Sequence, residues 1–342
     1  MDWFPIDKYV SIASVSVCCV CIMMSIMQYD NSSLLALGFI LLDVTLGLPF
    51  PCSSIVIQKF IEPHYQSLLW SLLALTSNLG AVISTSLVYY IRSIPKVFSI
   101  LAKFGMGCTV VFYVFFPQTE HSKLDNAKKT NQSVGQPVAR ELFCLILSFI
   151  AQFLIYLTRR IISEWSSVYL QHLFPVTTDQ SVTIFTYSSN LFEIFGIISL
   201  LLFGFLSTRF TSWTTLQSLS FCSFIAIIAT ALPQLASLGN KQWLYYVASG
   251  LSGFFLSIPY SMMELLIMQE CHHFRPSRVL GFASLNTQIA AAVAGYPVSL
   301  LFRSLCPFRL APLLEASFVL LAVVCLRCVS LIHSMESKQK SD

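Results

Sequence analysis

Residues 153–170 read FLIYLTRRIISEWSSVYL, and this stretch indicates the fold more directly than any other. Its ends are as apolar as a membrane interior, yet Arg159 and Arg160 stand in the middle, with Glu164 four residues beyond the second. A charge at the centre of a bilayer costs about 2.5–3.5 kcal/mol, so such side chains face a bundle interior or a wet cavity. The stretch therefore predicts a membrane-spanning helix that packs against other helices.

The composition of the whole chain is that of a membrane protein. Its 342 residues are 56% hydrophobic and only 11% charged, whereas a soluble domain carries about 25% charged residues. A helix needs about 20 apolar residues to cross a bilayer, and about ten runs of that length are present. The runs are 9–28, 34–57, 68–91, 97–117, 142–170, 182–206, 213–232, 243–269, 279–302 and 310–332. Because helices satisfy the backbone within lipid, we expect an all-α membrane protein with about ten transmembrane helices.

A polar segment divides the predicted spans into four and six. Residues 119–140, TEHSKLDNAKKTNQSVGQPVAR, are rich in Lys, Asn, Gln and Ser and are typical of a flexible linker. Transporters are commonly built from two related bundles of helices. We therefore expect residues 1–118 to be the remainder of an N-terminal bundle and residues 141–334 to be a C-terminal six-helix bundle. Relative to two bundles of six, the first two of the usual twelve helices are missing.

The basic residues indicate the orientation in the membrane. With the N-terminus in the cytosol, the cytosolic segments hold eleven Lys and Arg residues and the opposite side holds five, as the positive-inside rule predicts. The linker 119–140 and the tail 335–342 are then cytosolic. Lys338 and Lys340 in the tail resemble the KxKxx retrieval signal of the endoplasmic reticulum, although the positive-inside rule alone also produces a basic tail. We expect a multi-pass protein of the endoplasmic reticulum membrane.

Other classes of function lack their signals in this sequence. The basic residues are scattered over short loops, so we expect no nucleic-acid partner. Most of the eleven cysteines lie within spans, where they act as small apolar residues, and no Cys or His spacing predicts a metal site. A P-loop, a GxSxG motif and an HExxH motif are all absent, so we expect neither an enzyme nor a bound cofactor.

The two central arginines have different neighbours on their helix. Arg160 and Glu164 lie one turn apart on the same side and can neutralise each other. Arg159 is rotated away from that pair and shares its face with Tyr156 and Ser163. An uncompensated guanidinium among hydroxyl groups suits an oxyanion, because it stays charged and its planar fork matches phosphate or carboxylate oxygens. Arg159 is therefore a candidate anion-binding residue.

The acidic residues leave an alternative open. Glu193 lies inside the predicted span 182–206, where it either binds a coupling proton or cation or balances an arginine of a neighbouring helix. In the second case both arginines are structural and are paired with Glu164 and Glu193. Asn78 lies on a stripe of Ser, Thr and Gly that is either close helix packing or a cavity wall. Weaker candidates, for which interhelical hydrogen bonding is the plainer reading, are Asp43, Glu264 and Glu315.

The segment YLTRRIISEWSSVYL at 156–170 resembles the seventh helix of the organophosphate:phosphate antiporters of the major facilitator superfamily. The next span continues the resemblance with Glu193, Gly196, Gly204 and the ending LSTR at 206–209. Nearer the N-terminus, GLPFPCSS at 47–54, KFIEP at 59–63 and SNL at 77–79 resemble the fourth and fifth helices of the glucose-6-phosphate transporter group of this family.

This resemblance implies exchange of a sugar phosphate for inorganic phosphate by alternating access, with the site between two six-helix halves. In the family, arginines of the first and seventh helices clamp the phosphate, and Arg159 matches the seventh-helix position. Asn78 matches a position beside a substrate contact of the fifth helix. The resemblance further implies that Tyr156 and Ser163 line the face of Arg159 and that Glu193 sets the local charge.

The chain also departs from the family pattern. Met1 falls at about the loop before the third family helix, so the first-helix arginine of the phosphate clamp is absent. The resemblance therefore implies an N-terminally shortened antiporter, and leaves open whether the shortened form is active or inactive. PFPCSS at 49–54 replaces a Gly-Trp-Pro-Pro-Cys-Gly motif, and Thr208 replaces an aspartate. Two alternatives stand beside the antiporter: a transporter of another organic anion, and a non-transporting membrane protein that acts through a partner.

Overall fold

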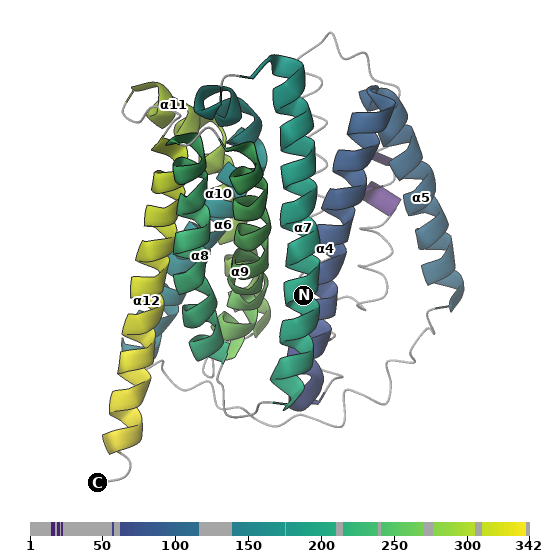
Figure 1. The fold of residues 1–342 in the computed structure, drawn as a ribbon. Helices are drawn as coiled ribbons and strands as arrows, with labels where there is room; N and C mark the ends of the chain where they lie inside the picture. The colour runs from purple at the N-terminus through teal and green to yellow at the C-terminus, as the bar shows by residue number, and fades with distance from the viewer. Residues whose placement is uncertain are drawn as a thin grey trace. The chain divides into compact units, whose positions relative to one another are not determined.

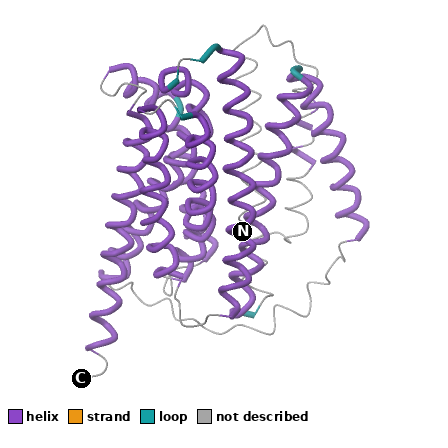
Figure 2. Tube along the Cα trace, in the orientation of Figure 1, coloured by secondary structure: helices purple, strands orange, loops and turns teal. Residues whose placement is uncertain are grey.

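The computed structural model describes residues 15–17, 19, 20, 22, 57, 62–115, 139–174, 176–209, 215–238, 241–269, 276–304 and 310–339. Within these residues the secondary structure is helical and contains no strand, which confirms the predicted all-α class (Figures 1 and 2). Several predicted features lie outside the described residues: the span 9–28 and the span 34–57 for the most part, Asp43, the motif 47–54, residues 59–61, the linker up to residue 138, and Lys340.

The chain forms two compact units, Met1–Phe60 with Leu87–Gly135, and Ile61–Ser86 with Gln136–Asp342. The described part of the first unit contains the end of α4 (Pro63–Ile91) and α5 (Ile94–Phe115). Arg92 ends α4, because it takes a left-handed φ of 51° and its N–H donates to Val88 O at 3.0 Å. The division into bundles at residues 118 and 141 stays a prediction.

The second unit contains most of α4 and the helices of the C-terminal part of the chain (Figure 1). These helices are α6 (Ala139–Leu173), α7 (Thr178–Arg209), α8 (Thr215–Leu238), α9 (Gln242–Gln269), α10 (Pro276–Ala294), α11 (Tyr296–Ser304) and α12 (Ala311–Gln339). α9 packs against α6, α7, α8 and α10, and α12 packs against α6 and α8. In the described part of the chain, seven helical stretches are long and apolar enough to cross a membrane.

The predicted span 279–302 is not one continuous helix. α10 and α11 lie on either side of a turn at Gly295. Pro297 explains the break, because proline lacks a backbone N–H for the preceding turn and its ring crowds that turn. The indole of Trp165 on α6 donates to Ala294 O at 2.6 Å, so the carbonyl beside the break is hydrogen-bonded. The break is therefore tied to α6, the helix that carries both central arginines.

α7 begins with a reciprocal cap that the sequence TTDQ encodes. The Gln180 N–H donates to Thr177 Oγ1 at 3.4 Å, and the Thr177 N–H donates to Gln180 Oε1 at 3.2 Å. This arrangement satisfies two backbone donors at the helix start, and Asp179 adds a negative charge at the positive end of the helix dipole. The cap fixes the start of the helix that carries Glu193.

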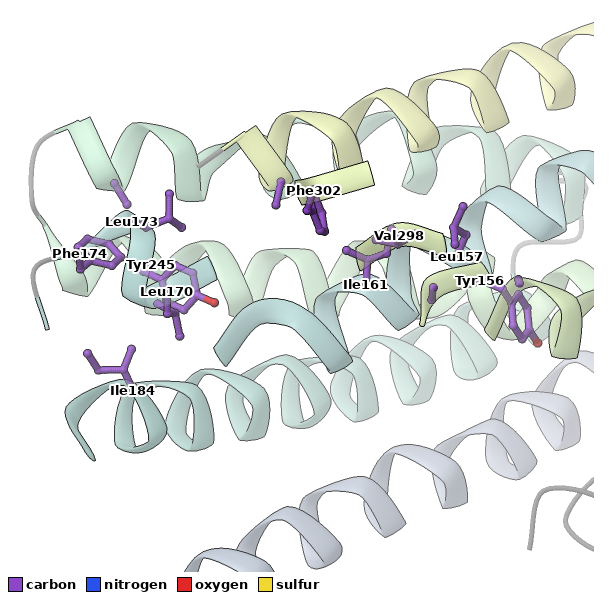
Figure 3. Close-up of a cluster of buried hydrophobic side chains, with 14 residues drawn as sticks. Tyr156, Leu157, Ile161, Leu170, Leu173, Phe174, Ile184, Tyr245, Val298 and Phe302 are labelled. Atoms are coloured by element: carbon purple, nitrogen blue, oxygen red, sulfur yellow. The ribbon is translucent and has the colours of Figure 1, made fainter. Parts of the chain in front are cut away.

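A cluster of buried apolar side chains joins helices α6 to α12 of the second unit (Figure 3). Ile161 and Leu170 of α6 are fully buried in it, and Val298 and Phe302 of α11 pack against the same cluster. Tyr156 lies at one end of the cluster (Figure 3). The core thus fixes the position of α6 around Arg159.

Candidate functional site

Arg159 is the centre of a buried polar site within the second unit. Its side chain is 7% exposed, although it lies in the middle of a membrane-spanning helix. Four side chains contact the guanidinium, and together with Arg159 we call them the arginine site: Asn78 of α4, Phe192 and Glu193 of α7, and Tyr260 of α9. Three helices therefore converge on one charge carried by a fourth.

The guanidinium uses one of its terminal nitrogens for two hydrogen bonds. Arg159 Nη2 donates to Glu193 Oε2 at 2.8 Å and to Asn78 Oδ1 at 2.9 Å. Its Cζ lies 4.0 Å from the centre of the Tyr260 ring and 5.6 Å from that of Phe192. Aromatic faces attract a cation, and more strongly where water is excluded. The ion pair, the amide and the two rings together offset the cost of taking the charge out of water.

These contacts correct the expectation of an uncompensated guanidinium. The helical positions of α6 show only the neighbours of Arg159 on its own helix, and its acidic partner Glu193 comes from α7. The structure contains the alternative that the sequence left open, in which Glu193 balances an arginine of a neighbouring helix. Asn78 lies against the same guanidinium, whereas the neighbouring Thr76, Ser77 and Gly80 are exposed.

The other terminal nitrogen of Arg159 remains available. Arg159 Nη1 and Asn78 Nδ2 are both buried, and neither has a hydrogen-bond partner among the described residues. Leaving a buried donor without a partner costs about 1–3 kcal/mol, and more for a charged group. The arginine site therefore holds a cation whose carboxylate partner occupies only one end of the planar fork.

Tyr156 supports the arginine site through its contact with Tyr260. Its ring stacks on the Tyr260 ring at 4.2 Å and 30°, and its hydroxyl donates to Glu264 Oε1 at 3.4 Å. Glu264 of α9 is 5% exposed, so this acid is buried beside the aromatic pair. Tyr156 thus holds the ring on which Arg159 lies. Tyr260 was not identified as a site residue from the sequence, and Glu264 was included only among the weaker candidates.

The other predicted residues of α6 lie away from the guanidinium. Arg160 Nη1 lies 3.9 Å from Glu164 Oε1, and these side chains are 46% and 38% exposed. Ser163 is exposed, and its hydroxyl donates to Arg159 O at 3.0 Å rather than into the arginine site. The assignment of Ser163 to the substrate-binding face of Arg159 stays a prediction. The described residues contain no group of His, Cys, Asp and Glu that is placed to hold a metal ion.

Comparisons with known protein sequences agree with this fold. The model of the Major Facilitator Superfamily matches residues 6–295. Among curated proteins, the "Probable hexose phosphate transport protein" of Chlamydia trachomatis serovar D is 28% identical over 156 residues. That match covers 44% of this chain and 32% of the relative, so it spans about a third of the relative's length.

Solved structures of transporters share the architecture. A crystal structure of FucP, a Major Facilitator Superfamily transporter, in the outward conformation has a TM-score of 0.70 at 13% identity, and the match covers 96% of this chain and 84% of that one. A bacterial homologue of the iron transporter ferroportin in the outward-facing state has a TM-score of 0.52 at 18% identity, with 95% of this chain and 82% of that one covered. At these identities the likeness shows the fold alone.

Proposed function

Since the chain belongs to the Major Facilitator Superfamily, we propose that it is an antiporter that exchanges a sugar phosphate, such as glucose 6-phosphate, for inorganic phosphate by alternating access. The observation that carries this proposal is the buried guanidinium of Arg159, whose Nη1 has no hydrogen-bond partner among the described residues. The printed name of the bacterial relative, a probable hexose phosphate transport protein, supports the same class of substrate.

In this proposal Arg159 binds the phosphoryl group. A guanidinium keeps its proton at any physiological pH, and its planar fork donates two parallel hydrogen bonds to phosphate oxygens. The ring of Tyr260 on one side restricts the rotation of the fork, and Tyr156 holds that ring in place through their stacking contact. Restricting the fork before the ligand arrives lowers the entropic cost of binding.

Glu193 balances Arg159 while no anion is bound. A phosphate at Nη1 and the carboxylate at Nη2 carry charges of the same sign within a few bond lengths, so they repel each other. Phosphate binding therefore weakens the ion pair between α6 and α7. This competition links occupancy of the site to the packing of two helices, which a carrier needs for its conformational change.

Asn78 contributes the second group in contact with the substrate. Its Oδ1 already accepts from Arg159, which aims the amide, and its Nδ2 is a buried donor for a phosphate or sugar oxygen. Ser163 lines the neighbouring exposed face of α6. Arg160 and Glu164 serve only to balance charge on that helix.

We place the carrier in the endoplasmic reticulum membrane, because Lys338 and Lys340 stand at the positions of a KxKxx retrieval signal. The basic residues place this tail in the cytosol, the side on which such a signal is read. Both substrates are anionic metabolites that cannot cross the bilayer unaided.

The test is a counterflow experiment with the purified chain in proteoliposomes loaded with inorganic phosphate. We expect uptake of labelled glucose 6-phosphate that requires internal phosphate, and no uptake of labelled glucose, since glucose offers Arg159 no anionic group. Competition by a dicarboxylate such as malate, with no competition by glucose 6-phosphate, would instead assign the site to another organic anion. Absence of any exchange would support a protein that acts through a partner.

A further inference from the structure

Four buried donor groups lie on α4, α6 and α9. They are Arg159 Nη1, Asn78 Nδ2, Ser257 Oγ and Ser261 Oγ, and none of the four atoms has a hydrogen-bond partner among the described residues. The four residues are 6%, 0%, 0% and 4% exposed. Most hydroxyl groups in these helices donate to the carbonyl three or four positions earlier, as Ser220 of α8 does to Leu216 O at 2.8 Å. The hydroxyls of Ser257 and Ser261 make no such hydrogen bond.

Gly196 of α7 shows that two of these donors lie close together. A Cβ added at Gly196 would overlap both Ser257 Oγ and Asn78 Nδ2, so the hydroxyl of α9 and the amide of α4 meet beside the same point of α7. The other end of that amide accepts from Arg159 Nη2 at 2.9 Å. The serine hydroxyl, the amide and the guanidinium therefore form one continuous group.

Ser261 lies one turn beyond Ser257 on the same face of α9. The ring of Tyr260, between them in sequence, lies against the guanidinium of Arg159. The indole of Trp70 donates to Ser261 O at 2.7 Å, which joins α4 to α9 beside this turn. The position of α9 relative to Arg159 and Asn78 is thus fixed by contacts on both helices.

The nitrogens of the group can only donate hydrogen bonds, whereas the serine hydroxyls can both donate and accept. The carboxylate of Glu193 already accepts from Arg159 Nη2 and leaves these donors unmatched. A surplus of buried donors suits a ligand with several acceptor oxygens on one atom, as in a phosphate group.

We propose that Ser257 of α9 is a further anion-binding residue, which donates its hydroxyl to a phosphate oxygen that Arg159 and Asn78 leave free. Ser261 is a second donor one turn away. This inference rests on the proposed phosphate site, and it adds α9 to α4 and α6 as a helix that binds the phosphate. Gly196 leaves room for both donors, because a Cβ there would displace the Ser257 hydroxyl and the Asn78 amide.

The test is a phosphate titration of thermal unfolding with the full chain in detergent, using inorganic phosphate as the probe. For Ser257→Ala we expect the phosphate concentration of half-maximal stabilisation to rise about tenfold, because a hydrogen bond to a charged group is lost. Without phosphate, we expect its melting temperature to equal or exceed that of the unsubstituted chain, because a buried hydroxyl without a partner is removed. A residue with a purely structural role would instead lower the melting temperature and leave the phosphate dependence unchanged.

Ser223→Ala is the matched control. Ser223 of α8 is also 0% exposed, and its hydroxyl also lacks a hydrogen-bond partner among the described residues, but it lies outside the donor group. We expect its phosphate dependence to equal that of the unsubstituted chain. Ser261→Ala provides a second variant of the site, with a smaller rise in the same direction. The inference is overturned if Ser257→Ala and Ser223→Ala have the same phosphate dependence.

A further variant separates this inference from the proposed function. Arg159→Met combined with Glu193→Gln removes both charges of the ion pair, so it leaves no unpaired buried charge. If phosphate stabilises the unsubstituted chain but not this double variant, phosphate binding at Arg159 is supported. That result holds even if Ser257→Ala leaves the phosphate dependence unchanged. If phosphate stabilises the double variant as well, or does not stabilise the unsubstituted chain, the phosphate site itself is wrong and the role of Ser257 falls with it.

Discussion

Arg159 and Arg160 differ by one position and about 100° around α6, and this rotation decides their surroundings. The Arg159 side chain is 7% exposed and is bonded to Glu193, whereas the Arg160 side chain is 46% exposed and lies 3.9 Å from Glu164. Removing one partner of a buried ion pair typically costs about 3–5 kcal/mol, because the other charge stays buried. An exposed pair four residues apart on a helix contributes only about 0.3–0.5 kcal/mol.

Arg159→Ala is therefore expected to lower the melting temperature in detergent far more than Arg160→Ala, by the equivalent of about 3–5 kcal/mol against less than about 1 kcal/mol. The double variant Arg159→Met with Glu193→Gln should recover most of that loss, since neither side chain is then charged. Thermal unfolding of the unsubstituted chain and the three variants in one detergent measures these differences in melting temperature. Equal melting temperatures for Arg159→Ala and Arg160→Ala would contradict the buried ion pair.

The sequence indicates one of these pairings and leaves the other open. Arg160 and Glu164 follow from their spacing on a single helix. Arg159 and Glu193 are 34 positions apart on two helices, so their contact depends on how α7 packs against α6. Periodicity identifies both residues as buried candidates but does not reveal which acid approaches which arginine.

Tyr260 was missed because it is one aromatic residue in a chain that is 13% aromatic. The sequence of α9 nevertheless contained a signal for this part of the site. Ser257, Ser261 and Glu264 recur at i, i+4 and i+7 within an otherwise apolar span, which places them on one face of α9. A polar stripe at this spacing predicts that the face is turned towards other polar groups, and Tyr260 stands within it.

At the scale of the helices, small residues set the distance between α7 and α9. A Cβ added at Gly253 of α9 would overlap the backbone carbonyl of Phe192 on α7, so these helices touch through their main chains. A Cβ added at Gly250, one turn earlier, would lie 3.4 Å from the Phe195 ring, an ordinary contact. Close approach at Gly253 brings the Phe192 and Glu193 turn of α7 against the helix that carries Tyr260.

Gly253→Ala is expected to destabilise the protein by about 1–3 kcal/mol, because the added methyl group must push the two backbones apart. Gly281→Ala on α10 is the control, since nothing lies within 4 Å of a Cβ there. Alanine in a helix is more favourable than glycine by about 1 kcal/mol, so this control should be neutral or stabilising. Melting temperatures that fall equally for both variants would show that α7 and α9 do not touch at Gly253.

The extent of the helices is largely predictable from the sequence. The described residues of the predicted spans from 68–91 onward are helical apart from the turn at Gly295, because long apolar runs in a membrane protein have few alternatives. The ends differ: hydropathy predicts 142–170 where α6 spans Ala139–Leu173, since a helix continues into polar residues beyond the apolar layer. The break before Pro297 interrupts a run that hydropathy treats as uniform.

For the molecule as a whole, the distribution of basic residues predicts that the C-terminal tail lies in the cytosol, the side on which a KxKxx signal is read. If the proposed retrieval signal holds the protein in the endoplasmic reticulum, replacing Lys338 and Lys340 with serine should move it to later membranes of the secretory pathway. Fluorescence microscopy of a chain with an internal tag in the linker measures this. Retention of the doubly substituted chain would show that another signal fixes its location.

In the proposed function, Arg159 binds the phosphoryl group of a transported substrate. The most direct measurement is phosphate-dependent uptake of labelled glucose 6-phosphate into proteoliposomes by three chains: the unsubstituted protein, Arg160→Ala, and Arg159→Met combined with Glu193→Gln. We expect uptake by the first two chains and none by the third, although all three are folded. Equal uptake by all three chains would contradict it.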